Sequence, residues 1–405
     1  MKKFIAVAAG LALAGTMATS AMAEVTFGGS ARARAITMMD YTDGGSISKI
    51  DSRVRLKVSA KAKGGAFAKA RIRLADGMWD GGNGATGNAA DDHNIYVDYG
   101  YVGATFGTVT ITAGRQIANF SKWFGWDGRK DRLKLLYKNA GTTVALFYDK
   151  NAELTDSSST TAFTVAQGGV TVNADGSETV TYTDASTSTN GDDWTADNDK
   201  NGYGVVVAQK FGDFKAAFIA IYGQDETPTD NNFLVGSLNL SGKAGGLNMA
   251  GEISMKDFDS ADDRQIGGYV SLGANMGAMS ITGIAGMTKD GFMADNDFGT
   301  HMIGNGNNSP ITYVSQIGTG GDTVFGVLAL GFKVSDQLAL NGFLTYATVD
   351  DFADLIEVSG GAVYTVSDGA ALTLAAGAVM PSDEGGLGGY DDTAFGAYAK
   401  FEVKY

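Results

Sequence analysis

Polar and apolar residues alternate along much of this chain, and that alternation constrains the fold more than any other feature. Residues 53–63 read Arg-Val-Arg-Leu-Lys-Val-Ser-Ala-Lys-Ala-Lys, and a matching pattern resumes after Gly64-Gly65-Ala66. A period of two is the mark of a β-strand whose two faces differ. A three-residue loop at 64–66 would place Lys57 opposite Arg73 and keep each face uniform, since opposed residues share a face. The sequence therefore predicts hairpins with one charged and one apolar face.

The same alternation recurs in further segments that are separated by turn signals. We expect tight turns near Gly64, Gly107, Gly141, Gly212, Gly245, Gly277, Ser335 and Asp368. Short turns at one end and long polar loops at the other are typical of a transmembrane barrel. We predict an all-β fold, a transmembrane antiparallel up-and-down β-barrel of roughly 16–18 strands. Weak strand signals near 311–320 and 352–366 account for that range.

Composition by itself does not reveal a membrane protein. Mean hydropathy is close to zero, and no segment after the N-terminal one approaches the 18 or more apolar residues of a helical span. A soluble β-sandwich or β-solenoid would show the same alternation, with its apolar face turned to a core. However, strands of roughly 10 to 13 residues are long for a sandwich. The barrel is therefore the better interpretation.

The N-terminal residues read as a secretory signal. Lys2 and Lys3 precede an apolar stretch, and Ala21-Met22-Ala23 forms a small-x-small cleavage site. This arrangement predicts a signal peptide at residues 1–23, with the barrel formed by residues 24–405.

The longest polar segment, at about 151–201, is expected to be a long extracellular loop. Its Val170–Val172 and Val180–Tyr182 segments predict an extra exposed hairpin. Asp197–Gly202 matches the first half of a calcium loop, but Ala208 stands where that loop requires a bidentate Glu. We therefore predict no metal site.

One face of the first three predicted strands carries eight cations, which we call the basic wall. Its members are Arg32, Arg34, Arg53, Arg55, Lys57, Lys69, Arg71 and Arg73. An eight-residue loop that pairs Arg34 with Arg53 would bring the first strand level with the others. In a barrel these side chains must face water, because each Arg near the bilayer midplane would cost about 2–4 kcal/mol on the lipid face. We interpret the basic wall as the cationic side of a constriction that attracts anions; alternatively, it only keeps the lumen hydrated.

Three features resemble the general porins of Gram-negative outer membranes. Tyr101–Val109, followed by Ala113-Gly114-Arg115-Gln116, is similar to the strand, Phe-Gly turn and Gly-Arg run that porins carry before their constriction loop. The chain ends on Tyr405, which resembles the aromatic signal for the barrel-insertion machinery, although Phe is usual there. A first strand also follows directly on the predicted cleavage site. The resemblance implies a homotrimer in the outer membrane, in contact with its lipid and lipopolysaccharide.

The resemblance makes residues 117–130 the constriction loop. Its candidate pore residues are Phe120, Lys122, Trp123, Trp126, Asp127 and Arg129. The segment departs from the family pattern, in which this loop is often long and acidic, because it is short and holds the single acid Asp127. Its aromatic side chains either pack the folded-in loop against the wall or form a stacking surface for sugar rings.

We therefore expect an outer-membrane porin that forms a water-filled channel for passive diffusion of ions and small hydrophilic solutes. The alternatives are a sugar-type substrate-specific porin and a structural or adhesive barrel. We expect no enzyme and no cofactor, since the two histidines, His93 and His301, lie near no defensible catalytic constellation. The formal net charge of −14 argues against a nucleic-acid partner, which requires a basic surface.

Overall fold

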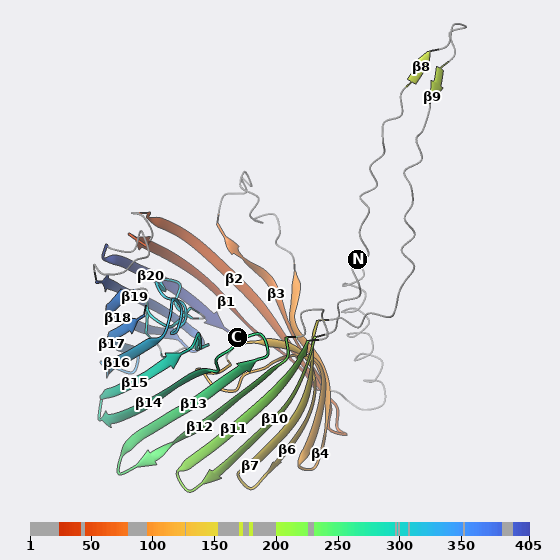
Figure 1. Cartoon of the computed structure of the whole chain (residues 1–405), viewed down its shortest axis with the longest axis horizontal. Coiled ribbons are helices and arrows are strands. Elements are labelled where there is room, and N and C mark those ends of the chain that lie inside the picture. Colours follow the sequence, from red (N-terminus) through yellow and green to blue (C-terminus); the bar gives the residue numbers. More distant parts are fainter. Residues whose placement is uncertain are drawn as a thin grey trace.

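A computed structural model gives the fold. It describes residues 24–41, 45–79, 95–125, 127–152, 170–172, 178–180, 200–225, 231–295, 298, 300–306, 308–350, 353–382 and 392–405. The predicted signal peptide lies outside these residues. Eighteen antiparallel strands form one sheet, each paired with its neighbours along the chain. β7 pairs with β10 and β20 pairs with β1, so the sheet closes into a barrel (Figure 1).

The strands confirm the upper end of the predicted count. In chain order the barrel strands are β1 (Glu24–Met39), β2 (Ile47–Lys61), β3 (Ala66–Met78), β4 (Tyr96–Phe106), β5 (Val109–Ile117), β6 (Arg129–Asn139), β7 (Thr142–Ala152), β10 (Lys200–Phe211), β11 (Phe214–Asp225), β12 (Phe233–Ala244), β13 (Leu247–Phe258), β14 (Gln265–Met276), β15 (Met279–Lys289), β16 (Thr323–Lys333), β17 (Leu338–Val349), β18 (Ala353–Ser367), β19 (Ala370–Pro381) and β20 (Ala394–Lys404). A separate hairpin within the long polar segment pairs β8 (Val170–Val172) with β9 (Glu178–Val180). The extra hairpin is thus present, with its second strand two residues earlier than expected.

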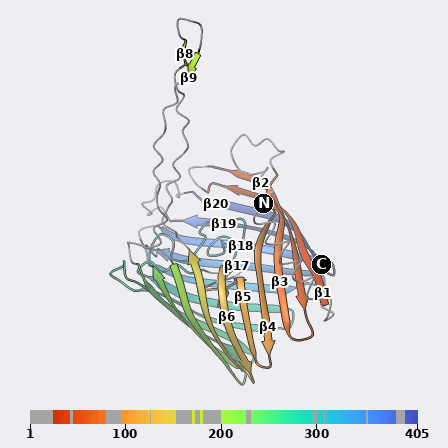
Figure 2. The same ribbon diagram turned by 90° about the vertical axis from the view of Figure 1, so that its right-hand side faces the viewer.

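All eight predicted tight turns join successive strands. At Gly107 and Gly141 the backbone φ is 60° and 90°, a left-handed conformation that glycine adopts without strain. β1 begins opposite the end of β2, because Glu24 pairs with Lys61 beside the first tight turn. Both ends of the barrel therefore lie on the short-turn side, and Figure 2 shows the first strands descending together to that end.

The outward and inward faces are the reverse of those in a soluble protein. On β13, the Ile253 side chain is 59% exposed, whereas the neighbouring Glu252 and Ser254 are 5% and 1% exposed. The same exposure of large apolar residues recurs on strand after strand around the barrel. An apolar outer belt and a polar interior fit a barrel in lipid and exclude the sandwich. No helix in the described part of the chain is long and apolar enough to cross a bilayer.

Two predicted registers are each wrong by two residues. Lys57 pairs with Arg71, not Arg73, because the turn between β2 and β3 is centred on Gly64 rather than Gly65. Arg34 pairs with Asp51, not Arg53, because the preceding loop is centred one residue earlier. A shift of two preserves the face of every side chain, so both faces of the hairpins stay uniform.

The segment 311–320 is not a strand. It belongs to the connection between β15 and β16, residues 290–322, which folds inside the barrel; we call this connection the inner loop (Figure 1). Gly318, Gly320 and Gly321 have φ values of 93°, 94° and 152°, and such a run of positive values lies outside the range of a regular β-strand. The other weak signal, 352–366, is the strand β18 and is confirmed.

The barrel closes where its last residue meets its first strand. The Gly29 N–H donates to the Tyr405 carbonyl at 2.6 Å, and the Tyr405 N–H donates to the Gly29 carbonyl at 3.2 Å. A β-carbon at Gly29 would lie 2.7 Å from the Tyr405 ring. Glycine is therefore required at this position for the aromatic terminus to lie against β1.

Candidate functional site

The structure brings all eight cations of the basic wall onto the inner face of β1, β2 and β3. The register opposes Arg32 to Arg53 and Arg55 to Arg73, and opposed residues share a face. Ile36 lies four residues after Arg32 and therefore on the same face of β1. It packs inside the barrel and is 2% exposed. The basic wall is therefore turned to the lumen, as the alternation predicted.

A carboxylate that sequence reasoning missed organises part of this wall. Asp98 on β4 accepts a hydrogen bond from Arg71, and its Oδ1 lies 2.9 Å from Arg129 Nε and 3.5 Å from Arg73 Nη2. The Asp98 side chain is 3% exposed. Three guanidinium groups, two from β3 and one from β6, thus share one buried carboxylate, which we call the Asp98 cluster.

A β-bulge places Asp98 in this position. Arg71 pairs with Tyr99 and Ile72 with Val97, so Asp98 is the unpaired extra residue of β4. Strict alternation would have put it on the lipid side, opposite in direction to Tyr99 and Tyr101. Bulges turn a side chain in this way without a sequence signature that alternation can detect.

The remaining cations divide into paired and unpaired groups. Arg34 forms a two-point ion pair with Asp51, at 2.8 and 2.6 Å, and Arg73 also binds Asp76. Arg32 and Arg53 face each other across strands, and within the described residues neither has an ion-pair partner. Lys57 and Lys69 are exposed. The basic wall therefore keeps an excess of positive charge.

Further cations continue the wall onto β6. Arg132 binds Asp149 at 2.5 and 2.8 Å and lies 3.9 Å above the ring of Phe147. Register places Lys134 opposite Thr112 on the same face. The sequence signal for these cations is the alternation of Arg132 and Lys134 with Leu133 on β6.

The predicted constriction loop crosses the interior. Its Ser121 hydroxyl donates to Glu252 Oε1 on β13 at 2.6 Å, although the two residues are 131 positions apart. Trp123 is fully buried and stacks on Phe292 and Phe325, with ring centroids 5.7 and 5.9 Å apart. Trp123 therefore packs the constriction loop against the inner loop and the wall.

The other predicted loop residues lie as follows. Phe120 is half-buried and contacts Phe124 edge to face, and Lys122 is exposed. Asp127 binds Arg129 at 3.0 Å, so the only acid of the loop is neutralised by a cation of β6. Trp126 lies outside the described residues.

The inner loop fills a large part of the barrel interior, and the sequence patterns did not predict this position. Its Phe292, Met302 and Ile311 are fully buried and pack with Phe325, Leu355 and Val379 of the barrel. Its length of more than 30 residues was the available signal, since surface loops of that length without strands are uncommon. Within the described residues no group of His, Cys, Asp and Glu could hold a metal.

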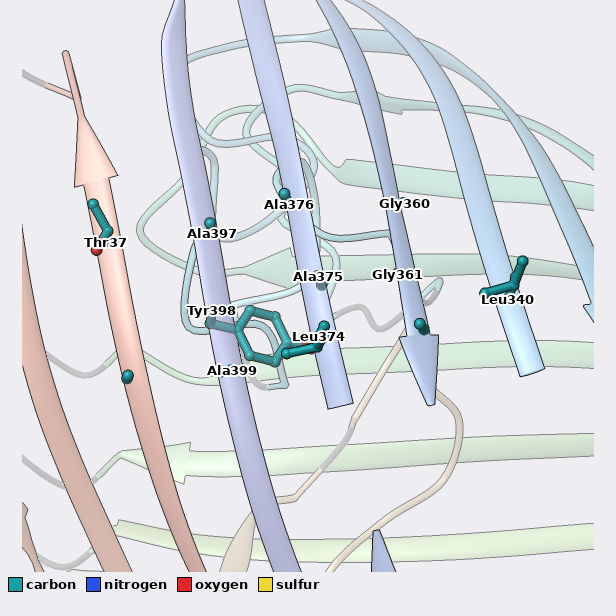
Figure 3. A pocket seen from close by; sticks show the side chains of 12 residues that line it. Thr37, Leu340, Gly360, Gly361, Leu374, Ala375, Ala376, Ala397, Tyr398 and Ala399 are labelled. Carbon is teal, nitrogen blue, oxygen red and sulfur yellow. The ribbon is translucent and has the colours of Figure 1, made fainter. Parts of the chain in front are cut away.

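The outer surface carries a hollow of about 650 Å³ over β17 to β20 and β1 (Figure 3). Small outward side chains line most of it, among them Ala35, Ala362, Ala376, Ala397 and Ala399. Elsewhere the outer face carries bulky residues such as Phe218, Leu238 and Val270. A second hollow, of about 730 Å³ over β11 to β15, is lined by such bulky residues, so the two hollows differ in the size of their side chains.

Comparisons with known proteins agree with this architecture. A family model described as "Gram-negative porin" matches residues 6–298. The outer membrane protein opdK from Pseudomonas aeruginosa is similar in structure, with 10% identity, a TM-score of 0.60, and coverage of 94% of this chain and 98% of that one. A BenF-like porin from Pseudomonas fluorescens Pf-5 gives the same four values.

Pseudomonas aeruginosa OpdO, at 9% identity and a TM-score of 0.61, covers 94% of this chain and 97% of its own. Likeness at such identity concerns the fold alone. No curated protein matches the sequence. The family match spans well over half of the chain, and with the closed barrel, apolar belt and polar interior it shows that this chain belongs to the Gram-negative porins, the channel proteins of the bacterial outer membrane.

Proposed function

We propose that the channel passes ions and small hydrophilic solutes by passive diffusion and favours anions where they pass the basic wall. The observation that carries the proposal is the pairing of Arg32 with Arg53 on the lumen face. Neither arginine forms an ion pair within the described residues, although the register sets Glu402 opposite Arg32 and Asp76 opposite Arg53. Like charges opposed across strands destabilise a sheet by up to about 1 kcal/mol. A fixed excess of positive charge at a water-filled wall raises the local concentration of anions.

Neutralising three unpaired cations should reduce the anion preference. The variant Arg32→Gln/Arg53→Gln/Lys57→Gln removes three positive charges and leaves Asp51, Asp76 and Asp98 with their partners. In a planar bilayer under a tenfold salt gradient, we expect the reversal potential to move toward the cation-selective value by tens of millivolts.

The matched control removes the same charge far from the wall. Lys210→Gln/Lys215→Gln/Lys243→Gln changes three lysines that cluster at the short turns of β10 to β13. We expect a much smaller shift from this control. Equal shifts in the two variants, or none in the first, would contradict the role of the basic wall.

Two other functions receive less support. A sugar-specific channel needs exposed stacking aromatics, and Trp123 is buried. A structural or adhesive barrel would be silent in bilayers, whereas a diffusion channel gives a steady open current. The proposed role needs no chemical reaction.

A homotrimer is proposed as the assembled state, with the outer hollow facing a second copy. Small residues allow close approach of two backbones in lipid, where packing rather than hydrophobic burial drives association. The hollow is bounded by β1 and β20, so the interface would also protect the seam where the barrel closes.

A bulky residue in the hollow should reduce assembly. We expect Ala399→Trp on β20 to convert trimers to monomers in native mass spectrometry from mild detergent. Ala220→Trp on β11, nine strands away around the barrel and also on the outer face, serves as the control. A trimer that persists in Ala399→Trp would rule out this interface.

The C-terminal strand is proposed as the segment read by the insertion machinery. Phe395, Phe401 and Tyr405 project outward from β20 and the terminus, and the Tyr405 side chain is 64% exposed. Lipid and lipopolysaccharide around the belt complete the proposed surroundings.

A further inference from the structure

We propose that Glu357 on β18 sets the size limit of the channel by holding the inner loop folded inside the barrel. The proposal depends on the lumen being conductive, as proposed above, but not on its anion preference. In this proposal, a carboxylate far from the predicted constriction loop controls how large a solute can pass.

The carboxylate is bound by the loop backbone. Glu357 Oε1 accepts the N–H groups of His301 and Met302 at 3.0 and 3.2 Å, and Oε2 accepts the Ile303 N–H at 2.8 Å. The Ser359 hydroxyl also donates to Oε1. Successive backbone N–H groups that converge on one anion form a nest, which binds negative charge strongly.

Nothing else in the described structure accounts for a charged group in this position. Glu357 is fully buried, and no Lys or Arg forms an ion pair with it among the described residues. Burial lowers the pKa of the adjacent His301, which favours the uncharged imidazole. A buried carboxylate without a cation requires hydrogen bonds instead, and the loop amides supply them.

Other side chains contact single polar groups of the loop: Lys256 Nζ donates to the Met293 carbonyl at 2.8 Å, the Tyr41 hydroxyl donates to the Ile311 carbonyl, and Asn341 Oδ1 lies 3.4 Å from His301 Nε2. The loop also makes apolar contacts with glycines of the inner wall. A β-carbon at Gly377 would lie 2.8 Å from Met302 Sδ, and one at Gly396 would lie 2.8 Å from Ile311. These glycines let the loop approach the wall closely, but they hold no polar group of it. The three amides bound by Glu357 are adjacent in sequence and cannot satisfy one another, so without the carboxylate they require water.

The inner loop and the constriction loop are linked. The Asp295 N–H donates to the Trp123 carbonyl at 2.9 Å, and Trp123 stacks on Phe292 of the inner loop. The constriction loop is in turn bound by Glu252 through Ser121. A wall carboxylate therefore binds each inserted loop, Glu357 through three consecutive amides of the inner loop, and release of the inner loop removes the larger obstruction.

The test compares Glu357→Ala and Glu357→Gln with the unaltered protein. The probes are uncharged polyethylene glycols of graded size, used in liposome swelling, together with single-channel conductance in planar bilayers. We expect Glu357→Ala to admit larger polymers and to raise the conductance about twofold or more. Glu357→Gln should give a smaller change, because its amide keeps one acceptor oxygen.

Glu402→Gln is the matched control. Glu402 also faces the lumen, from β20, and its Oε2 lies 3.7 Å from Lys400 and 3.9 Å from Lys404 rather than against a loop amide. The Glu402→Gln substitution removes the same charge as Glu357→Gln, and we expect it to leave the size limit of the channel unchanged. An uncharged probe separates the size limit from any change in ion preference.

A second measurement follows the loop itself. The chain has no cysteine, so Met302→Cys introduces a single thiol at a fully buried position. We expect a water-soluble maleimide to label it slowly in the Met302→Cys barrel and at least tenfold faster when Glu357→Ala or Glu357→Gln is added. Heat-modifiable gel migration verifies that each barrel has folded, and the Gln variant serves if the Ala variant does not assemble.

The outcomes separate the two proposals. No conductance by the unaltered protein contradicts the diffusion channel. Normal conductance with the same polymer limit in both Glu357 variants overturns the role of Glu357, whether or not the thiol becomes reactive. Equal effects from Glu402→Gln would also overturn it, because they would assign the change to charge alone.

Discussion

Replacing Trp123 by alanine should destabilise the folded barrel by about 3–5 kcal/mol, the usual cost of truncating a fully buried large aromatic residue. Trp123 is 0% exposed and lies among Tyr269, Phe292, Phe298 and Phe325, with centroids 5.4 to 5.9 Å apart. Its removal leaves a cavity between the constriction loop, the inner loop and the wall. The loss of unfolding free energy is measured by denaturant titration in detergent micelles. Far-ultraviolet circular dichroism monitors unfolding, so the signal does not rely on tryptophan fluorescence.

The comparison variant is Phe120→Ala in the same loop. Phe120 is half-buried, and among the described residues its one close ring partner is Phe124, at 6.1 Å. We expect its truncation to cost about 1 kcal/mol, as for a partly exposed aromatic pair. Equal losses in the two variants would show that Trp123 does not join the two inserted loops in a common core.

Asp98→Asn should have the second largest effect, a destabilisation of about 3 kcal/mol, because it leaves three guanidinium groups without their shared charge. The change keeps the shape of the side chain, so the loss reports on charge rather than packing. Arg71 and Asp98 have side chains 8% and 3% exposed, so water compensates little. The same denaturant titration measures this effect.

Asp51→Asn provides the control for Asp98→Asn. Asp51 also binds an arginine of the wall, but it serves only Arg34, and both side chains are 15% exposed. We expect a loss of about 1 kcal/mol or less, in the range of partly hydrated single pairs. A loss at Asp98 no greater than that at Asp51 would contradict the cluster as the organising feature of the wall.

Alternation predicted the barrel because it indicates on which face of a strand each side chain lies. This assignment remains correct even where the predicted register is not. The predicted registers of the two hairpins of the basic wall each differ from the structure by two residues, yet all eight cations lie on the inner face. A period of two is insensitive to an even shift. Tight turns were located for a similar reason, since glycine at positive φ is a local requirement.

The sequence failed where the chain leaves a regular pattern. Asp98 reaches the lumen through a bulge that reverses its face, and no residue-by-residue pattern predicts one extra residue in a ladder. An irregularity between β2 and β3 likewise brings Asp76 level with Arg53 and into contact with Arg73. The positions of both carboxylates depend on where the pairing of two strands becomes irregular.

By itself, the sequence determined the fold class, the strand directions, the lumen-facing cations and the family, because these follow from local periodicity and short motifs. Only the tertiary structure decided what fills the lumen. The inner loop is bound by Glu357 and the constriction loop by Glu252, and these carboxylates lie 54 or more and 131 positions away from the groups they bind. Contacts at such separation arise from the closure of the barrel, which brings distant strands around a common interior, and no local pattern encodes them.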